Sequence, residues 1–107
     1  MTGNVLVEVG AERKRQDSIF GTQNHRDGTS DHPVSRRISD GYRDICRRIT
    51  QEGDVTWKDI LSEEVYEAYA EADPVLLRAE LVQVAAVAVA WIEAIDRRPP
   101  VSAEEAC

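Results

Sequence analysis

The apolar residues of this chain recur at helical spacing rather than in strict alternation, and they predict four helices. The clearest case is residues 34–52, where apolar side chains follow one another at steps of four, four, three and four and form one stripe. That stripe consists of Val34, Ile38, Tyr42, Ile45 and Ile49. Residues 3–17 also suit a helix, although Val5, Leu6 and Val7 alone would fit a short strand.

Start and stop signals mark the ends of the helices after residue 33. Gly53 is a stop signal for the helix over residues 34–52. Thr56 has the chemistry of an N-cap, with Asp59 three residues later as its capping-box partner. Pro74 suits the first turn of a helix and disfavours helix in the residue before it. We therefore expect helices over residues 57–73 and 74–97.

The segments between and after the helices are polar. Residues 20–33 are rich in Gly, Asn, Asp, Ser and Pro, which is the chemistry of a loop. A loop of that length is unusual in a compact domain and is typically functional or mobile. Residues 99–107 follow an Arg-Arg-Pro-Pro run and are expected to form a disordered tail. The fold class we predict is all-α, with one domain of about four bundled helices over residues 1–98.

Composition narrows the function classes. At 107 residues the chain has room for one domain and not for a multidomain enzyme. It has 13 Lys and Arg against 20 Asp and Glu, and residues 55–107 carry the whole net charge of −7. This argues against nucleic-acid binding, which clustered cations drive. No apolar run approaches the roughly 18 residues that a membrane span needs, so no membrane association is expected. The N-terminus does not resemble a signal peptide, and two cysteines, Cys46 and Cys107, fit a reducing cytoplasm.

The predicted helix over residues 74–97 is apolar on nearly all sides. Val82, Ala85 and Val89 continue the apolar surface on the side away from Glu80. A helix of this kind is deeply buried, but a chain of four helices offers few others to cover it. We therefore expect a homo-oligomer, either a dimer or a tetramer.

Several carboxylates occupy apolar positions. At about 100° per residue, Glu64, Glu67 and Glu71 fall within or beside the apolar sector that Trp57 defines on its helix. On the next helix, Glu80 and its neighbour Gln83 lie in the sector of the apolar residues. That sector contains Leu76, Val84, Val87 and Trp91.

Such carboxylates need partners. An unpaired carboxylate in a core is very costly, and buried charges are paired or bind metal. Between residues 55 and 96 the only cations are Lys58 and Arg78, and the helical wheel turns both away. Three carboxylates and an amide form an oxygen-only ligand set, which suits Mg²⁺ or Mn²⁺. The competing interpretation is that the glutamate stems pack while their heads reach water.

Two motifs carry a resemblance to a known family. Glu63–Glu67 reads EEVYE, and Glu80–Gln83 reads ELVQ after a spacer of twelve residues. This resembles the EExxE and ExxD signature of the all-α nucleoside triphosphate pyrophosphohydrolases, which include MazG and the dimeric dUTPases. Residues 56–97, and the stretch ERKRQDSIFGTQNHRDGT before them, look like the small MazG-like proteins of actinobacteria and their phages.

The resemblance implies a Mg²⁺-dependent enzyme with a MazG-like core that cleaves an NTP or dNTP to the monophosphate and pyrophosphate. Glu64, Glu67 and Glu80 match the family's metal ligands, and Glu63 or Glu67 would take the proton of the attacking water. Gln83 stands where the family has Asp; its amide oxygen can ligate a metal but brings no charge. Two other hypotheses remain open. The chain could be a nucleotide- or metal-binding protein without turnover, or a purely structural helical dimer.

Two further groups of residues are candidates for substrate contact. Gln23, Asn24 and His25 lie in the long loop, where amides and an imidazole suit contact with a nucleobase. Trp57 and Trp91 share the sectors of the glutamates. Core packing is the first interpretation of the two tryptophans, and stacking on a base is the second.

Overall fold

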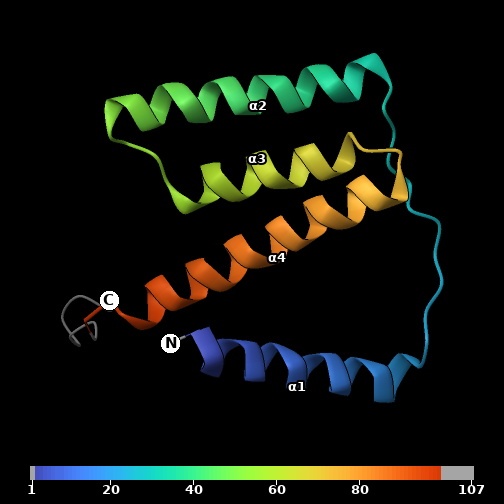
Figure 1. Cartoon of the computed structure of the whole chain (residues 1–107). Helices are drawn as coiled ribbons and strands as arrows, with labels where there is room; N and C mark the ends of the chain where they lie inside the picture. The colour runs from blue at the N-terminus through green and yellow to red at the C-terminus, as the bar shows by residue number, and fades with distance from the viewer. Residues whose placement is uncertain (1, 100–107) are drawn as a thin grey trace, which may run out of the picture.

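The computed structural model describes residues 2–99, and within that range it is all-helical, with four helices and no strand. Two helices come before residue 53, α1 (Thr2–Phe20) and α2 (Pro33–Glu52). Two follow it, α3 (Trp57–Tyr69) and α4 (Pro74–Asp96). The predicted fold class and number of helices are confirmed (Figure 1). The tail predicted over residues 99–107 lies, from residue 100 on, outside the described residues.

The predicted end signals act as expected. Gly53 adopts a left-handed conformation with φ of 82° and ends α2. The Thr56 hydroxyl accepts from the Asp59 amide, and the Asp59 carboxylate accepts from the Thr56 amide, which completes a capping box. Asp73 caps α4 by accepting from the amide of Val75. Each of these caps satisfies amide or carbonyl groups that a helix end leaves without a partner.

Two helix boundaries differ from the prediction. α3 ends at Tyr69, four residues before the predicted end at Asp73. As the N-cap before a proline, Asp73 must be extended (ψ of 122°), so the chain leaves the helix earlier. At the other end of the chain, α1 is continuous from Thr2 to Phe20, so it ends three residues after the predicted end at residue 17. The strand alternative for residues 5–7 is wrong.

Residues 21–32 form the predicted long connection and contain no regular secondary structure. The Ser30 amide donates to the Tyr69 carbonyl at 3.1 Å and ties the connection to the end of α3. His32 then caps α2, with its Nδ1 accepting from the Val34 amide at 3.1 Å.

The helices lie side by side in a single layer, in the spatial order α2, α3, α4, α1 (Figure 1). Neighbours in this layer run antiparallel. The structure measures 49 × 44 × 26 Å, so it is thin in one direction. Its radius of gyration is 17.0 Å, against about 13 Å for a compact domain of this length.

The buried residues are small. Apart from Val5 and Leu77 they are Ser39, Cys46, Ala68 and Ala70. On α2, the buried positions are Ser39 and Cys46, whereas the apolar stripe from the sequence is half exposed, with Ile38 at 44% and Ile45 at 47%. α2 therefore packs on α3 through small side chains and through Tyr42, whose ring stacks on that of Tyr66 at 4.3 Å.

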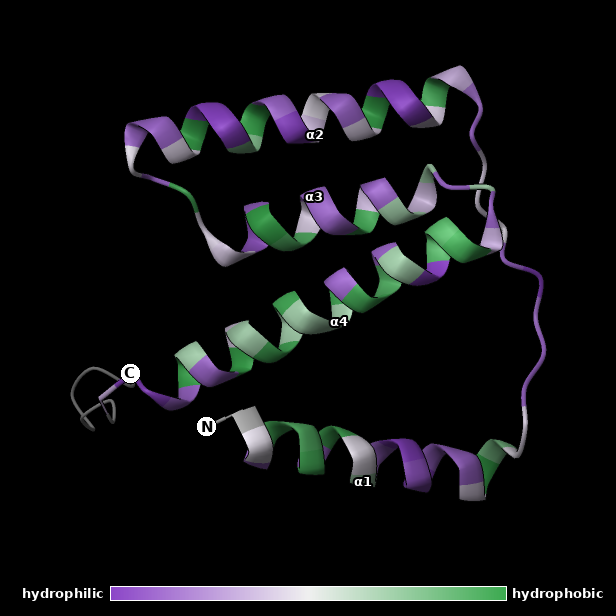
Figure 2. Cartoon of the chain, viewed as in Figure 1, coloured by the Kyte–Doolittle hydropathy of each residue, from purple (hydrophilic) through white to green (hydrophobic). Residues whose placement is uncertain are grey.

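Apolar residues extend along almost all of α4 and the first half of α1 (Figure 2). In the described part of the chain, α4 is the one helix long and apolar enough, by length and composition, to cross a membrane. The core helix of a soluble protein meets the same criterion, so this property does not decide between the two environments.

Candidate metal centre

The structure brings three of the predicted ligands together. Carboxylate oxygens of Glu64, Glu67 and Glu80 all lie within 4.8 Å of one another. We call these three residues the glutamate triad. All three side chains are partly buried; Glu64 and Glu67 belong to α3 and Glu80 belongs to α4.

Local packing explains why the triad forms. Glu64 and Glu67 are three residues apart, so they lie on one side of α3. The connection between α3 and α4 is short, and the antiparallel return of α4 places Glu80 opposite them. Ala68 is 1% exposed and Leu77 is 6% exposed, so the two helices are in tight contact beside the triad.

Partial burial and neighbouring carboxylates raise the pKa values of two members of the triad, Glu64 and Glu80. Partial burial raises the pKa of Glu64, and the carboxylates of Glu67, Glu80 and Glu63 raise it further. The pKa of Glu80 is raised by partial burial and then by Glu67 and Glu71, while Arg43 opposes the increase. A divalent cation among these oxygens would remove the repulsion.

Two arginines of α2 partner the inward glutamates. Glu67 Oε1 accepts from Arg43 Nη2 at 3.0 Å and from Arg43 Nε at 3.2 Å. Glu71, which is not in the triad, accepts from Arg36 Nη2 at 3.2 Å. The prediction that these carboxylates lack cationic partners considered residues 55–96 only, and it is wrong for Glu67 and Glu71. Arg36 and Arg43 are seven residues apart, which places them on one side of a helix and was the available signal.

The other predicted members of the site lie around the triad. Glu63 is not among the three residues with converging oxygens. It lies near Cys46 of α2, where burial and then the Glu63 carboxylate raise the pKa of the thiol. Gln83 lies one turn beyond Glu80 and is exposed.

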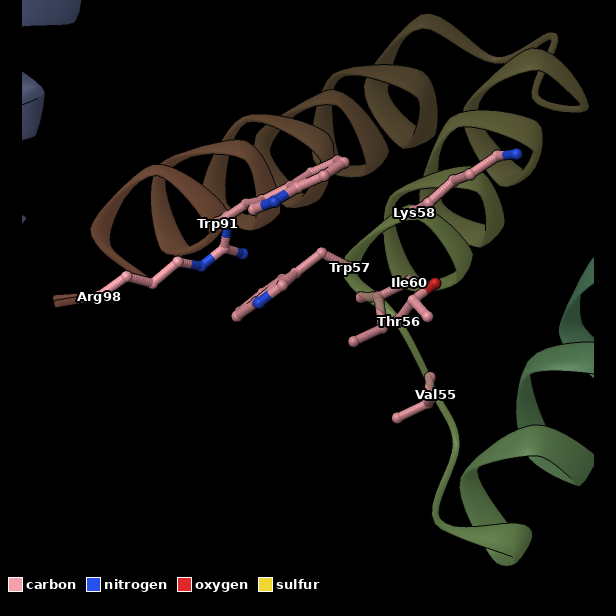
Figure 3. Close-up of a pocket in the computed structure, with 7 residues that line it drawn as sticks. All are labelled: Val55, Thr56, Trp57, Lys58, Ile60, Trp91 and Arg98. Carbon is pink, nitrogen blue, oxygen red and sulfur yellow. The ribbon is translucent and has the colours of Figure 1, made fainter. Parts of the chain in front are cut away.

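Trp57 and Trp91 line a cavity of about 580 Å³ between the start of α3 and the end of α4. Figure 3 shows the two indole rings directed toward the same space, with the Arg98 guanidinium beside them. Lys58 also lines the cavity, but its ammonium group points away. Trp57 and Glu64 are seven residues apart on α3, which is about 10 Å along the helix axis.

The three loop candidates are exposed. Gln23, Asn24 and His25 lie in the connection after α1, and Gln23 Nε2 is 3.4 Å from His25 Nε2. Gln23 lines a hollow together with Arg13 and Asp17 of α1. Because α4 lies between α1 and α3, this hollow is separated from the triad (Figure 1).

Comparison with protein-family models, curated protein sequences and solved structures found no match to this chain. The resemblance to MazG-like enzymes therefore depends on the EEVYE and ELVQ motifs and on the sequence stretches described with them.

Proposed function

We propose that the chain is a Mg²⁺-dependent pyrophosphohydrolase that converts an NTP or dNTP and water to the monophosphate and pyrophosphate. The observation that supports this proposal is the glutamate triad, in which residues from both motifs have carboxylate oxygens within 4.8 Å. Oxygen-only sets of this kind suit Mg²⁺ or Mn²⁺, which retain waters and recruit phosphate oxygens.

The residues present fit such an ion. Both hydrogen bonds from Arg43 go to Oε1 of Glu67, so they leave Oε2 for a cation. Glu64 and Glu80 supply two more carboxylates. Partial burial, and then the neighbouring carboxylates, raise the pKa values of both, and a cation would offset the repulsion between the carboxylates. When bound, Mg²⁺ would neutralise the triphosphate and increase the acidity of a water.

In the proposed reaction, the oxygen of water forms a bond to the α-phosphorus and the bond to the leaving pyrophosphate oxygen breaks. A carboxylate accepts the proton of the water. The candidates for this role are Glu67, in the triad, and Glu63, one residue before Glu64. Glu63 is the candidate base that a metal would leave free, because it is not one of the three converging carboxylates.

The cavity between the two tryptophans fits the other end of the substrate. An indole provides a flat surface on which any base can stack. Stacking of this kind typically stabilises binding by about 1–3 kcal/mol per base. Trp57 and Trp91 project into one space from the two helices that carry the triad. With the triphosphate held at the triad, we place the base beside these indoles and Arg98.

A second candidate function is nucleotide or metal binding without turnover. The observation that favours it is Gln83, which is neutral and exposed where an aspartate would add a charge beside Glu80. The ion pairs Arg43–Glu67 and Arg36–Glu71 favour a third, purely structural role for the inward glutamates.

The test is pyrophosphate release from a panel of NTPs and dNTPs with Mg²⁺ or Mn²⁺. We expect metal-dependent release by the wild type, its loss in Glu64→Gln, and no loss in Glu52→Gln, an exposed glutamate at the end of α2. No release by the wild type, with release restored by Gln83→Asp, would favour binding without turnover. No release of pyrophosphate by the wild type or by Gln83→Asp would refute the enzymatic proposal.

A further inference from the structure

The polar side chains that face the tryptophan cavity are hydrogen-bond donors. Trp57 and Trp91 each have an indole N–H, and Arg98 has a guanidinium, and neither kind of group can accept. Among the described lining residues, Thr56 has the one side-chain acceptor, and its hydroxyl is engaged in the capping box. It accepts from the Asp59 amide at 3.2 Å and donates to the Asp59 carboxylate at 2.8 Å. The side chains of this cavity therefore suit a base edge that presents acceptors.

The triad, the indoles and Arg98 follow one another along α4. Trp91 comes 11 residues after Glu80, which is about 16 Å along the helix axis, and Arg98 follows just beyond the end of α4. The guanidinium of Arg98 returns toward the indoles and lies beside them (Figure 3). A nucleotide has its phosphates, sugar and base in the same order. With the phosphates at the triad, the indoles separate Arg98 from them, so Arg98 is placed to contact the base.

The guanidinium of Arg98 has a geometry that distinguishes the bases. It presents paired N–H donors in a rigid, planar fork. Guanine and hypoxanthine have two neighbouring acceptors, O6 and N7, and the bidentate pairing of arginine with O6 and N7 is the commonest specific contact to guanine. Adenine has an amino donor in place of O6, and cytosine has an amino donor on the edge away from its sugar. Uracil has a single acceptor there, O4, next to the N3–H donor.

We propose that this cavity selects 6-oxopurine nucleotides, those of guanine and hypoxanthine, and that Arg98 determines the specificity by donating two hydrogen bonds to O6 and N7 of the stacked base. The inference rests on the proposed function and names the substrate class of that site. A good bidentate pair discriminates against the wrong base by about 5- to 150-fold. Because Arg98 is exposed and water competes for its donors, we expect about tenfold.

A purely structural role for Arg98 leads to a different expectation. A guanidinium beside an indole is attracted to the face of the ring, and this attraction would hold Arg98 against Trp91 without any bound base. Such a contact does not distinguish guanine from adenine. The preference among bases therefore separates the two roles.

The test is binding of nucleoside monophosphates to the purified full chain with Mg²⁺, followed by NMR of the indole N–H signals. The chain has two tryptophans and both line the cavity, so both signals report on it. Monophosphates are products of the proposed reaction and are not consumed. We expect both signals to shift, with a Kd for GMP and IMP about tenfold lower than for AMP, UMP and 7-deaza-GMP, which lacks the N7 acceptor.

Two variants locate the selectivity. Arg98→Met keeps an apolar stem and removes the donors, so it should bind GMP and AMP with equal Kd while both indole signals still shift. Arg97→Met changes the neighbouring residue, which does not line the cavity, and should keep the tenfold preference. If Arg98→Met fails to fold, the comparison of GMP with 7-deaza-GMP on the wild type decides.

Three results would overturn the proposal. These are equal Kd values for GMP and AMP in the wild type, a preference that persists in Arg98→Met, and indole signals that shift with no nucleotide. Failure of the proposed hydrolysis is a separate result. A wild type that prefers GMP but releases pyrophosphate from no NTP would refute the hydrolysis and support the selectivity of the cavity, whereas equal kcat/KM for GTP and ATP would support the hydrolysis and refute the selectivity.

Discussion

Removing one charge from the glutamate triad should stabilise the metal-free protein and abolish its response to metal. The change is Glu80→Gln, which keeps the size of the side chain. Two unit charges 4.8 Å apart repel by about 0.9 kcal/mol in water and by about 3.5 kcal/mol at an effective dielectric constant of 20. The repulsion is close to the lower of these two energies, because the triad is only partly buried and Arg43 attracts Glu80.

We therefore expect Glu80→Gln to stabilise the metal-free protein by about 1 kcal/mol, which raises the Tm by about 4–8 °C in a domain of this size. The wild type should instead gain stability from Mg²⁺ or Mn²⁺. A ligand of the native state at ten times its Kd contributes about 1.4 kcal/mol. The order of the two Tm values should thus reverse. The variant has the higher Tm in EDTA, and the wild type has the higher Tm with metal.

Thermal unfolding followed by circular dichroism measures these changes in Tm. One fixed protein concentration is used, because association of copies would make the Tm depend on concentration. Glu52→Gln, an exposed glutamate on α2, is the matched control and should behave as the wild type. If the Tm of the wild type does not change with either metal, the triad is not a metal site. If Glu80→Gln keeps the full response, the metal binds elsewhere.

Three further predictions concern the same site. The pKa values of Glu64 and Glu80 are raised, so the stability of the metal-free protein should fall as the pH rises from their ordinary value of 4.5 through the raised values. Over the same pH range the stability gained from Mg²⁺ should grow. Thermal unfolding against pH, with Mg²⁺ and with EDTA, measures both changes, and a gain from Mg²⁺ that does not vary with pH would contradict this prediction. Arg43→Met should lower the metal-free Tm by several degrees and enlarge the Mg²⁺ response, because a competing cation is removed, whereas the control Arg36→Met should leave that response unchanged. Trp91→Ala should raise the KM for the nucleotide about 5- to 150-fold with a smaller change in kcat; an unchanged KM in steady-state assays would remove Trp91 from the site.

The helices and their caps were predictable because their signals are local. The capping box of Thr56 and Asp59, and the left-handed Gly53, depend on residues within one turn of each other. The end of α3 was not predicted, because Ala70 to Ala72 are compatible with helix. The conformation that Asp73 needs as the cap of α4 forces the earlier end.

The triad was predictable for a related reason. The i, i+3 spacing of Glu64 and Glu67 fixes their shared side of α3, and a short turn returns α4 beside it. Arg43 was missed because its contact with Glu67 spans 24 residues, and depends on how α2 lies against α3. The apolar stripe of α2 suggested a different inner side from the one that Ser39 and Cys46 form.

The most direct test of the central claim is the identity of the products, by phosphorus-31 NMR of a nucleoside triphosphate incubated with the wild type and Mg²⁺. We expect equal amounts of nucleoside monophosphate and pyrophosphate, and no reaction in EDTA. Orthophosphate with nucleoside diphosphate would show cleavage of a different bond. An unchanged spectrum for every base and sugar tested, with the wild type and with Gln83→Asp, would contradict the proposed pyrophosphohydrolase activity.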